Sequence, residues 1–277
     1  SYAESQLEEL KQAAAADEEV YQLLERYQLP DTTEHILAAN RMVNRRNQVF
    51  SKMFNSDEVF SGGPIDFAAI REEILGRFAE ALKTPEEMAA AQEALADTAE
   101  RVMKTMIADK EHITSMDIRE LKLMNTQISI AGKMADNEEY TIPVLVGGDV
   151  TNISLKIVRG TEKKGMVEIL FETDRAGKVA ARLEAKEEGV SGFAATDNKE
   201  MQQMLEQHIQ DITNEFEPEK SDLQVTYVSK LNFSRFSDHY KPKETAREAD
   251  EETYQVQTAR LYKIAKGFLE GIKKLSF

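Results

Sequence analysis

Over residues 1–135, apolar side chains recur three and four positions apart, as they do on the buried face of an amphipathic helix. Residues 5–29 carry the first such stripe, and the proline that follows ends it because proline cannot continue a helix. Asp31 and Glu34 then have the spacing of a capping box, in which side chains satisfy the free amide groups of a helix start. We therefore expect one helix before the proline and a second one that runs toward Phe54.

Three further helices are predicted in this part of the chain. Thr84 marks the start of the middle one, since Pro85 and Glu87 occupy the first-turn and capping positions that these residues favour. The expected ranges are 67–82, 84–109 and 114–134. Residues 1–135 therefore predict a bundle of about five helices.

Beyond the bundle, between residues 138 and 230, the apolar period changes to two, which is typical of strands with one buried face. Alternating segments occur at 142–146, 152–157, 167–171, 179–185, 189–193 and 223–227. Asp197 and Glu200 have capping spacing, and an apolar stripe from Met201 to Phe216 follows them. We expect a β-rich domain of about five strands with one helix packed across a face, so the fold class is α+β.

The end of the chain is predicted to be a polar linker, residues 231–250, and an amphipathic helix, residues 251–277. Residues 260–277 hold five basic and one acidic side chain, a net charge of +4, so the rest of the chain carries −15 − 4 = −19. A basic amphipathic helix can dock on a membrane surface or on a partner. We expect instead that its apolar face packs on the bundle and that its lysines lie near the acidic surface.

Composition excludes several classes of function. The net charge of −15 repels a phosphate backbone, so nucleic-acid binding is not expected. The chain has no cysteine, which excludes disulfides, thiolate metal sites and cysteine nucleophiles. No apolar run approaches the roughly 20 residues that cross a bilayer, and "SYAESQLEEL" has no features of a secretory signal. We expect a cytoplasmic location without membrane contact, and the oligomeric state stays open.

Residues that carry chemistry are sparse. The four histidines fall on different predicted elements, and none has the H-x-x-x-H spacing of a metal site. His208 lies on an apolar stripe and is better explained as a residue at the edge of a core. EF-hand, phosphate-loop and G-x-S-x-G patterns are missing, so no metal, cofactor or catalytic residue is predicted. An enzyme stays possible only if folding brings separated polar residues into one cleft.

Methionines in the bundle allow two interpretations. Met103, Met106, Met116 and Met124 could line an adaptable binding groove, because methionine is flexible and polarizable. At helical spacing they more often fill a core, and core packing is the interpretation that we favour.

One segment carries a family resemblance. In residues 171–228, Gly177 is followed by an alternating strand, a second strand, an apolar helix that includes Leu205 and Ile209, and a closing strand. This pattern resembles the C-terminal domain of the flagellar hook-length control protein family. The family's proline position falls at Thr173 or Asp174, and its leucine before the glycine is Ala176. A helical bundle also stands where the familiar members have a long extended ruler segment, a layout similar to that of uncharacterised proteins of Gram-positive anaerobes.

The resemblance implies a non-enzymatic bacterial regulator of flagellar type III export. Such a protein senses hook completion, contacts the cytoplasmic domain of the export gate and switches the substrate class, and it can itself be exported through the flagellar apparatus. The predicted contact set is the turn that leads into the strand: Thr173, Asp174, Arg175, Ala176, Gly177 and Val179. The alternative is a structural or adaptor protein that uses the bundle for protein–protein binding.

Overall fold

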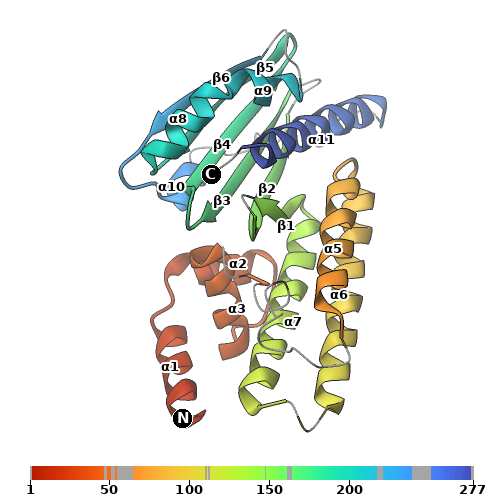
Figure 1. Ribbon diagram of the computed structural model, residues 1–277, viewed down its shortest axis with the longest axis vertical. Helices are drawn as coiled ribbons and strands as arrows, with labels where there is room; N and C mark the ends of the chain where they lie inside the picture. The colour runs from red at the N-terminus through yellow and green to blue at the C-terminus, as the bar shows by residue number, and fades with distance from the viewer. Residues whose placement is uncertain are drawn as a thin grey trace. The chain divides into compact units, whose positions relative to one another are not determined.

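The protein has an α+β fold. Over the residues that the structure describes, helices α1 to α7 precede a six-stranded sheet and further helices follow it. Figure 1 shows this arrangement. The predicted fold class is therefore confirmed. The computed structural model describes residues 2–46, 49–50, 54, 65–109, 111, 113–146, 148–160, 164–216, 221–238 and 251–275. Two compact units divide the chain: residues 1–77 with 89–137, and residues 78–88 with 138–277.

The helices of the first part are α1 (Tyr2–Ala14), α2 (Glu18–Arg26), α3 (Thr33–Asn44), α5 (Phe67–Ala81), α6 (Pro85–Ala108) and α7 (Ser115–Ala135). The stripe over residues 5–29 predicts one helix, but the structure has two, α1 and α2. The break lies at Asp17, whose backbone is extended with φ −76° and ψ 170° at the N-cap of α2. The Asp17 side chain makes no capping hydrogen bond to α2, and its carboxylate instead accepts one from Asn44 Nδ2 at 3.3 Å.

The helix starts differ in part from the predicted ones. Thr84 caps α6 as expected, since the Glu87 backbone N–H donates to its hydroxyl oxygen at 3.1 Å. For α3 the cap is Thr32, whose hydroxyl oxygen accepts from the backbone N–H of His35 at 3.3 Å, and not Asp31. Aspartate and threonine side chains can both cap a helix, so local sequence does not decide between Asp31 and Thr32. The tertiary structure decides which of the two faces the free amides. The expected continuation of this helix toward Phe54 falls partly outside the described residues.

Side-chain contacts link α3 to α7 and α7 to α6. The Arg41 guanidinium donates two hydrogen bonds to the Glu120 carboxylate on α7, at 3.0 and 3.2 Å. α6 and α7 also touch, where Asn125 Nδ2 lies 3.4 Å from the sulfur of Met103. Met106 and Met124 are buried, which agrees with methionine as core filling. The burial of Met116 lies outside what the structure describes.

The sheet runs in the order β1-β2-β3-β4-β5-β6, one strand more than predicted. Its strands are β1 (Glu139–Val146), β2 (Asp149–Arg159), β3 (Gly165–Thr173), β4 (Gly177–Lys186), β5 (Gly189–Thr196) and β6 (Ser221–Tyr227). The first five form an antiparallel meander, and β6 pairs parallel with β5. A parallel neighbour needs a crossover connection, which α8 (Lys199–Gln207) and α9 (Ile209–Asn214) provide.

Both faces of the sheet are covered at least in part. One face, here the α11 face, contains the row Leu155, Ile169, Ala181 and Ala194, and it packs under α8, α9 and α11 (Glu251–Lys273), as Figure 1 shows. The opposite face, here the α10 face, contains Leu170, Ala180 and Ala195, which form a cluster with Leu231 and Phe233. The short helix α10 (Phe233–Asp238) therefore packs on the sheet inside the segment where the sequence indicates a linker.

The N-cap of α8, the helix after β5, is Asn198 and not Asp197. The Asn198 side-chain oxygen accepts from the backbone N–H groups of Glu200 and Met201, at 2.9 and 3.1 Å. Buried positions of the predicted stripe include Leu205 and Ile212, on either side of the break between α8 and α9 at His208. The His208 ring is partly exposed, and its Nδ1 lies 2.9 Å from the Met204 carbonyl oxygen, as a residue at the edge of a core would.

α11 packs on the sheet and on α9, where the sequence predicts packing on the bundle. Its apolar face is almost fully buried, with Leu261 and Ile264 at 1% exposure and Phe268 at 0%. A Cβ atom at Gly267 would lie 2.6 Å from the Glu215 carbonyl oxygen, so only glycine allows α11 to approach α9 this closely. The helix is thus part of the core of this unit. Its basic face reaches the same neighbour, where Lys274 forms an ion pair with Glu215.

Candidate functional site

The predicted contact set lies at the hairpin turn between β3 and β4. Thr173 pairs with Gly177 across the hairpin, and three residues form the loop between them. Gly177 has φ +66°, the left-handed conformation that closes a three-residue hairpin loop. A Cβ atom there would also lie 2.6 Å from the Asp197 carboxylate oxygen. Glycine is therefore favoured at this position both by the backbone conformation and by the neighbouring Asp197 side chain.

Hydrogen bonds tie this turn to the start of α8. The Lys178 backbone N–H donates to Asp197 Oδ1 at 2.8 Å, and the Asn198 amide Nδ2 donates to the Arg175 carbonyl oxygen at 3.0 Å. Inside the turn, the Ala176 backbone N–H donates to the Thr173 hydroxyl oxygen at 2.9 Å. The turn is thus held by its own loop and by the residues that precede α8.

Burial divides the predicted contact set. Ala176 and Val179 are 0% exposed and Thr173 is 6% exposed, so these three side chains belong to the core. Asp174 and Arg175 are exposed at the tip of the turn. A partner that contacted this turn would meet those two side chains and the surrounding backbone.

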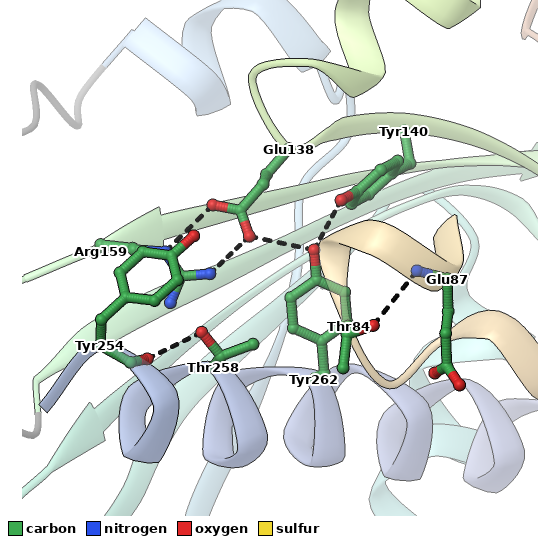
Figure 2. A network of polar contacts seen from close by, with 8 residues as sticks. All are labelled: Thr84, Glu87, Glu138, Tyr140, Arg159, Tyr254, Thr258 and Tyr262. Carbon is green, nitrogen blue, oxygen red and sulfur yellow. Dashed lines mark hydrogen bonds and ion pairs between the residues drawn. The ribbon is translucent and has the colours of Figure 1, made fainter. Parts of the chain in front are cut away.

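A second polar cluster lies on the α11 face of the sheet, at the beginning of β1 (Figure 2). The hydroxyl oxygens of Tyr140 and Tyr262 are 2.5 Å apart, and Tyr262 donates to Glu138 Oε1 at 3.0 Å. Arg159 donates to the same carboxylate through Nε at 3.1 Å and through Nη2 at 2.6 Å. Its guanidinium carbon lies 4.1 Å from the centre of the Tyr254 ring. The cluster thus joins β1, β2 and α11.

Glu138, which accepts these hydrogen bonds, has an unusual backbone conformation. Its φ is +56°, which L-residues other than glycine adopt rarely, and its carbonyl oxygen accepts from the Ile157 N–H at 3.0 Å. Glu138 lies between the end of α7 and the start of β1. Its backbone conformation directs the chain into the sheet, and its carboxylate lies beside Arg159.

The two buried tyrosines are held in their neutral form. Burial raises the pKa of Tyr140 and of Tyr262 well above the usual range of a phenol, and the Glu138 carboxylate raises both further. A phenol with a raised pKa is a hydrogen-bond donor and does not supply a phenolate base near neutral pH. The cluster is therefore suited to holding α11 on the sheet, which is a structural role.

On the α10 face, charged residues of alternating sign form a row across four neighbouring strands. Glu139, Lys156, Glu168 and Arg182 are direct cross-strand neighbours in that order. The Lys156–Glu139 and Arg182–Glu168 pairs are separated by 3.6 and 3.5 Å. Glu168 and Arg182 are 4% and 8% exposed, so burial makes their mutual pairing necessary.

α10 covers one end of this row. Arg182 Nη2 donates to the Phe236 carbonyl oxygen at 2.6 Å, and its guanidinium carbon lies 5.1 and 5.9 Å from the Phe236 and Phe193 ring centres. The two rings are themselves 5.4 Å apart. Arginine favours such faces because its flat, weakly hydrated cation stacks on aromatic rings.

Within the part of the chain that the structure describes, no group of three His, Cys, Asp or Glu side chains is arranged to hold a metal ion. His35 contacts its own helix cap, with Nδ1 2.8 Å from the Thr32 hydroxyl oxygen. His112 and His239 lie outside the described residues. None of the helices over the described ranges is long and apolar enough to cross a bilayer.

Comparison with known proteins gives no relative. Scans of protein-family models, of curated proteins and of solved structures found no match to this chain.

The polar clusters were not predicted from the sequence, although the sequence contains features that point to some of their residues. Tyr140 and Tyr262 each stand among apolar residues that alternate or recur, and a hydroxyl at such a position needs a buried partner. Glu138 and Arg159 lie just outside two predicted strand segments, which marks them as candidates for pairing at a strand end. Sequence alone does not show which residues of the cluster are partners, because Glu138 and Tyr262 are 124 residues apart in the chain.

Proposed function

We propose that this chain is a non-enzymatic interaction protein whose sheet unit docks on a component of the flagellar export machinery and regulates substrate switching. The observation that carries this proposal is the order of elements in residues 177–227: β4, β5, the helices α8 and α9, then β6. This is the order that the resemblance to hook-length control proteins implies. The partner in this proposal is the cytoplasmic domain of the export gate.

The polar groups of the unit support a docking role over a chemical one. Arg159 is bonded to Glu138, and Arg182 to Glu168 and to a backbone carbonyl, so the four charges neutralise each other in pairs. Removing one member of a buried pair leaves the other charge without its partner, so these groups are used within the fold. The exposed surface then carries the function.

The proposed contact point is the tip of the β3–β4 turn. Asp174 and Arg175 are exposed there on a backbone that three hydrogen bonds hold. A rigid tip loses little conformational freedom on binding, which favours its use in recognition.

Exchange of the two charges tests this contact. A variant with Asp174→Arg and Arg175→Asp keeps the net charge and the buried residues, and it should bind the purified cytoplasmic domain of the gate about tenfold more weakly in calorimetric titration. The matched control exchanges Lys186 and Glu187, which are exposed in the turn at the other end of β4. The control should bind as wild type does.

Two results would contradict the proposal. If wild type does not bind the gate domain, the assignment to flagellar export fails. If the exchanged variant and the wild type bind equally, the export assignment stands but the turn is not the contact point.

A second candidate function is an adaptor that binds a helix of another protein through α1. Ala3, Leu7, Leu10 and Ala14 share one face of this helix and are all exposed, Leu7 and Leu10 by 54% and 55%. This spacing is the a/d pattern of a helix that packs against another helix. A photo-cross-linking residue at position 7 should then capture one protein reproducibly, while the same residue at Tyr21, exposed by 41%, should not.

A further inference from the structure

The two edges of the sheet differ in how far they are protected. Six of the eight β1 residues are buried, against one of the seven in β6. β1 also contains Pro143, which has no N–H to offer to an added strand. β6 contains no proline and no lysine, and its register with β5 runs without a bulge. Among its own residues, β6 carries one of the features that block edge pairing in natural sheets, the charge of Asp222.

The direction of the β6 amides follows from one hydrogen bond. The Val228 N–H donates to the Thr196 carbonyl oxygen at 2.9 Å, so it points toward β5. Successive residues of a strand point their N–H groups to opposite sides. The N–H groups of Leu223, Val225 and Tyr227 therefore point away from β5, on the side where the sheet order ends.

Side chains around this edge leave it open on one face. α8 and α9 cover β6 on the α11 face. On the α10 face, Asp222, Gln224 and Thr226 are exposed, and Phe193, the cross-strand neighbour of Gln224, is 40% exposed. An added strand would find backbone donors at the edge and an aromatic ring beside it.

The surroundings of the edge are strongly acidic. The described residues 196–216 and 221–228 hold six acidic side chains and one basic side chain, 1 − 6 = −5, out of a chain total of −15. Asp222 lies on β6 itself, and the exposed Glu206 and Asp211 lie on the helices that cover it. A second copy of the chain would bring an equal negative charge to this edge, whereas a basic segment is attracted.

We infer that β6 binds an extended, lysine- or arginine-containing segment of a partner protein, which adds to the sheet as a seventh strand. Main-chain hydrogen bonds to Leu223, Val225 and Tyr227 supply the affinity, and the acidic surroundings select a basic sequence. This inference rests on the proposed role as an interaction protein, and it names a surface separate from the β3–β4 turn.

The test uses the whole chain and a synthetic probe. The probe is a capped octapeptide with lysine at alternate positions and valine or threonine between them. Amide hydrogen exchange followed by NMR should slow at Leu223, Val225 and Tyr227 when the peptide is added, and it should not change at α11. Binding should weaken about tenfold as salt rises to 1 M, where the screening length falls to about 3 Å.

Two modified peptides separate strand addition from simple charge attraction. N-methylation of alternate amides removes the donors of one peptide edge and keeps every charge, so it should weaken binding about tenfold or more. Replacement of lysine by glutamate should abolish binding. In the protein, Val225→Pro removes one outward donor, and Glu206→Lys with Asp211→Lys weakens the charge without altering the edge. The peptide comparison decides the matter even if the proline variant does not fold.

Several outcomes would overturn the inference. Equal binding of the N-methylated and unmodified peptides would mean that charge alone attracts the probe. No binding of the lysine peptide, or protection of the three amides through a dimer seen in sedimentation without peptide, would exclude a basic partner strand. Because the probe contains no flagellar sequence, this test can fail while gate binding succeeds, and the reverse is equally possible.

Discussion

The hydroxyl groups of Tyr140 on β1 and Tyr262 on α11 meet at 2.5 Å, although 122 residues separate them in the chain. Their rings cross at 66° with centres 6.4 Å apart, an edge-to-face arrangement. The Glu138 carboxylate accepts from Tyr262 and from Arg159, so one acidic group links two strands to the terminal helix. This contact fixes the position of α11 along the sheet.

Removal of one phenol should therefore destabilise the protein. Tyr262→Phe leaves the Tyr140 hydroxyl without its partner and Glu138 with one donor fewer, which should lower the free energy of unfolding by about 1–3 kcal/mol. Urea denaturation followed by circular dichroism measures this change. The control is Tyr254→Phe on the same helix, whose side chain is 40% exposed and should lose less than about 0.5 kcal/mol. Equal losses in the two variants would contradict the buried contact.

The same pair predicts the alkaline behaviour of the protein. Burial raises the pKa of both phenols in the folded chain, so they stay protonated where an unfolded chain ionises, above about pH 10. The unfolded state then binds fewer protons than the folded one, and stability falls as pH rises. Below pH 10 this contribution is fully present. Denaturation midpoints across pH 8 to roughly 11 should fall more steeply for wild type than for a Tyr140→Phe, Tyr262→Phe double variant.

Absorbance titration checks the protonation directly. In the folded protein, the change in ultraviolet absorbance on tyrosine ionisation should have the same amplitude in wild type and in the double variant, because the two phenols do not ionise before unfolding. A smaller amplitude in the double variant would show that they titrate in the folded state.

Two glycines should respond to alanine in opposite directions. Gly177→Ala places a Cβ atom 2.6 Å from the Asp197 carboxylate on a backbone with φ +66°, and it should destabilise the protein by about 1–3 kcal/mol. Gly76→Ala adds a methyl group to the interior of α5, where it would meet no side chain beyond its chain neighbours within 4 Å, and it should stabilise the protein by about 0.5–1 kcal/mol. Thermal unfolding of both variants gives the signs. A neutral Gly177 variant would mean that the turn relaxes.

Substitution of Thr32 and of Asp31, the two residues before α3, should have different effects on stability. Thr32→Ala removes the hydroxyl that accepts from the His35 amide, which should cost about 1 kcal/mol of stability. Asp31→Ala changes an exposed residue outside the cap and should stay within about 0.5 kcal/mol of wild type. The unfolding midpoints of the two variants in urea show which residue caps the helix. A larger loss of stability for Asp31→Ala than for Thr32→Ala would support the capping box that the sequence predicts.

The sequence by itself determined the features that depend on residues a few positions apart. Alternation at residues 153–157 marks β2 because successive side chains of a strand face opposite sides, and Thr84 with Glu87 marks the start of α6 because the cap bonds an amide three residues on. The change from a helical to a two-residue period separates the helices from the sheet. These signals are local, and the α+β class followed from them.

Only the tertiary structure decided which distant surfaces meet. α11 is amphipathic in the sequence, but its stripe fits a sheet as well as a bundle, and the close approach of Gly267 to α9 becomes visible only when both helices are placed. The same holds for the predicted contact set, in which Ala176, outside the alternating segment, proved to be buried. Long-range pairing arises from chain closure over many residues, so no local pattern encodes it.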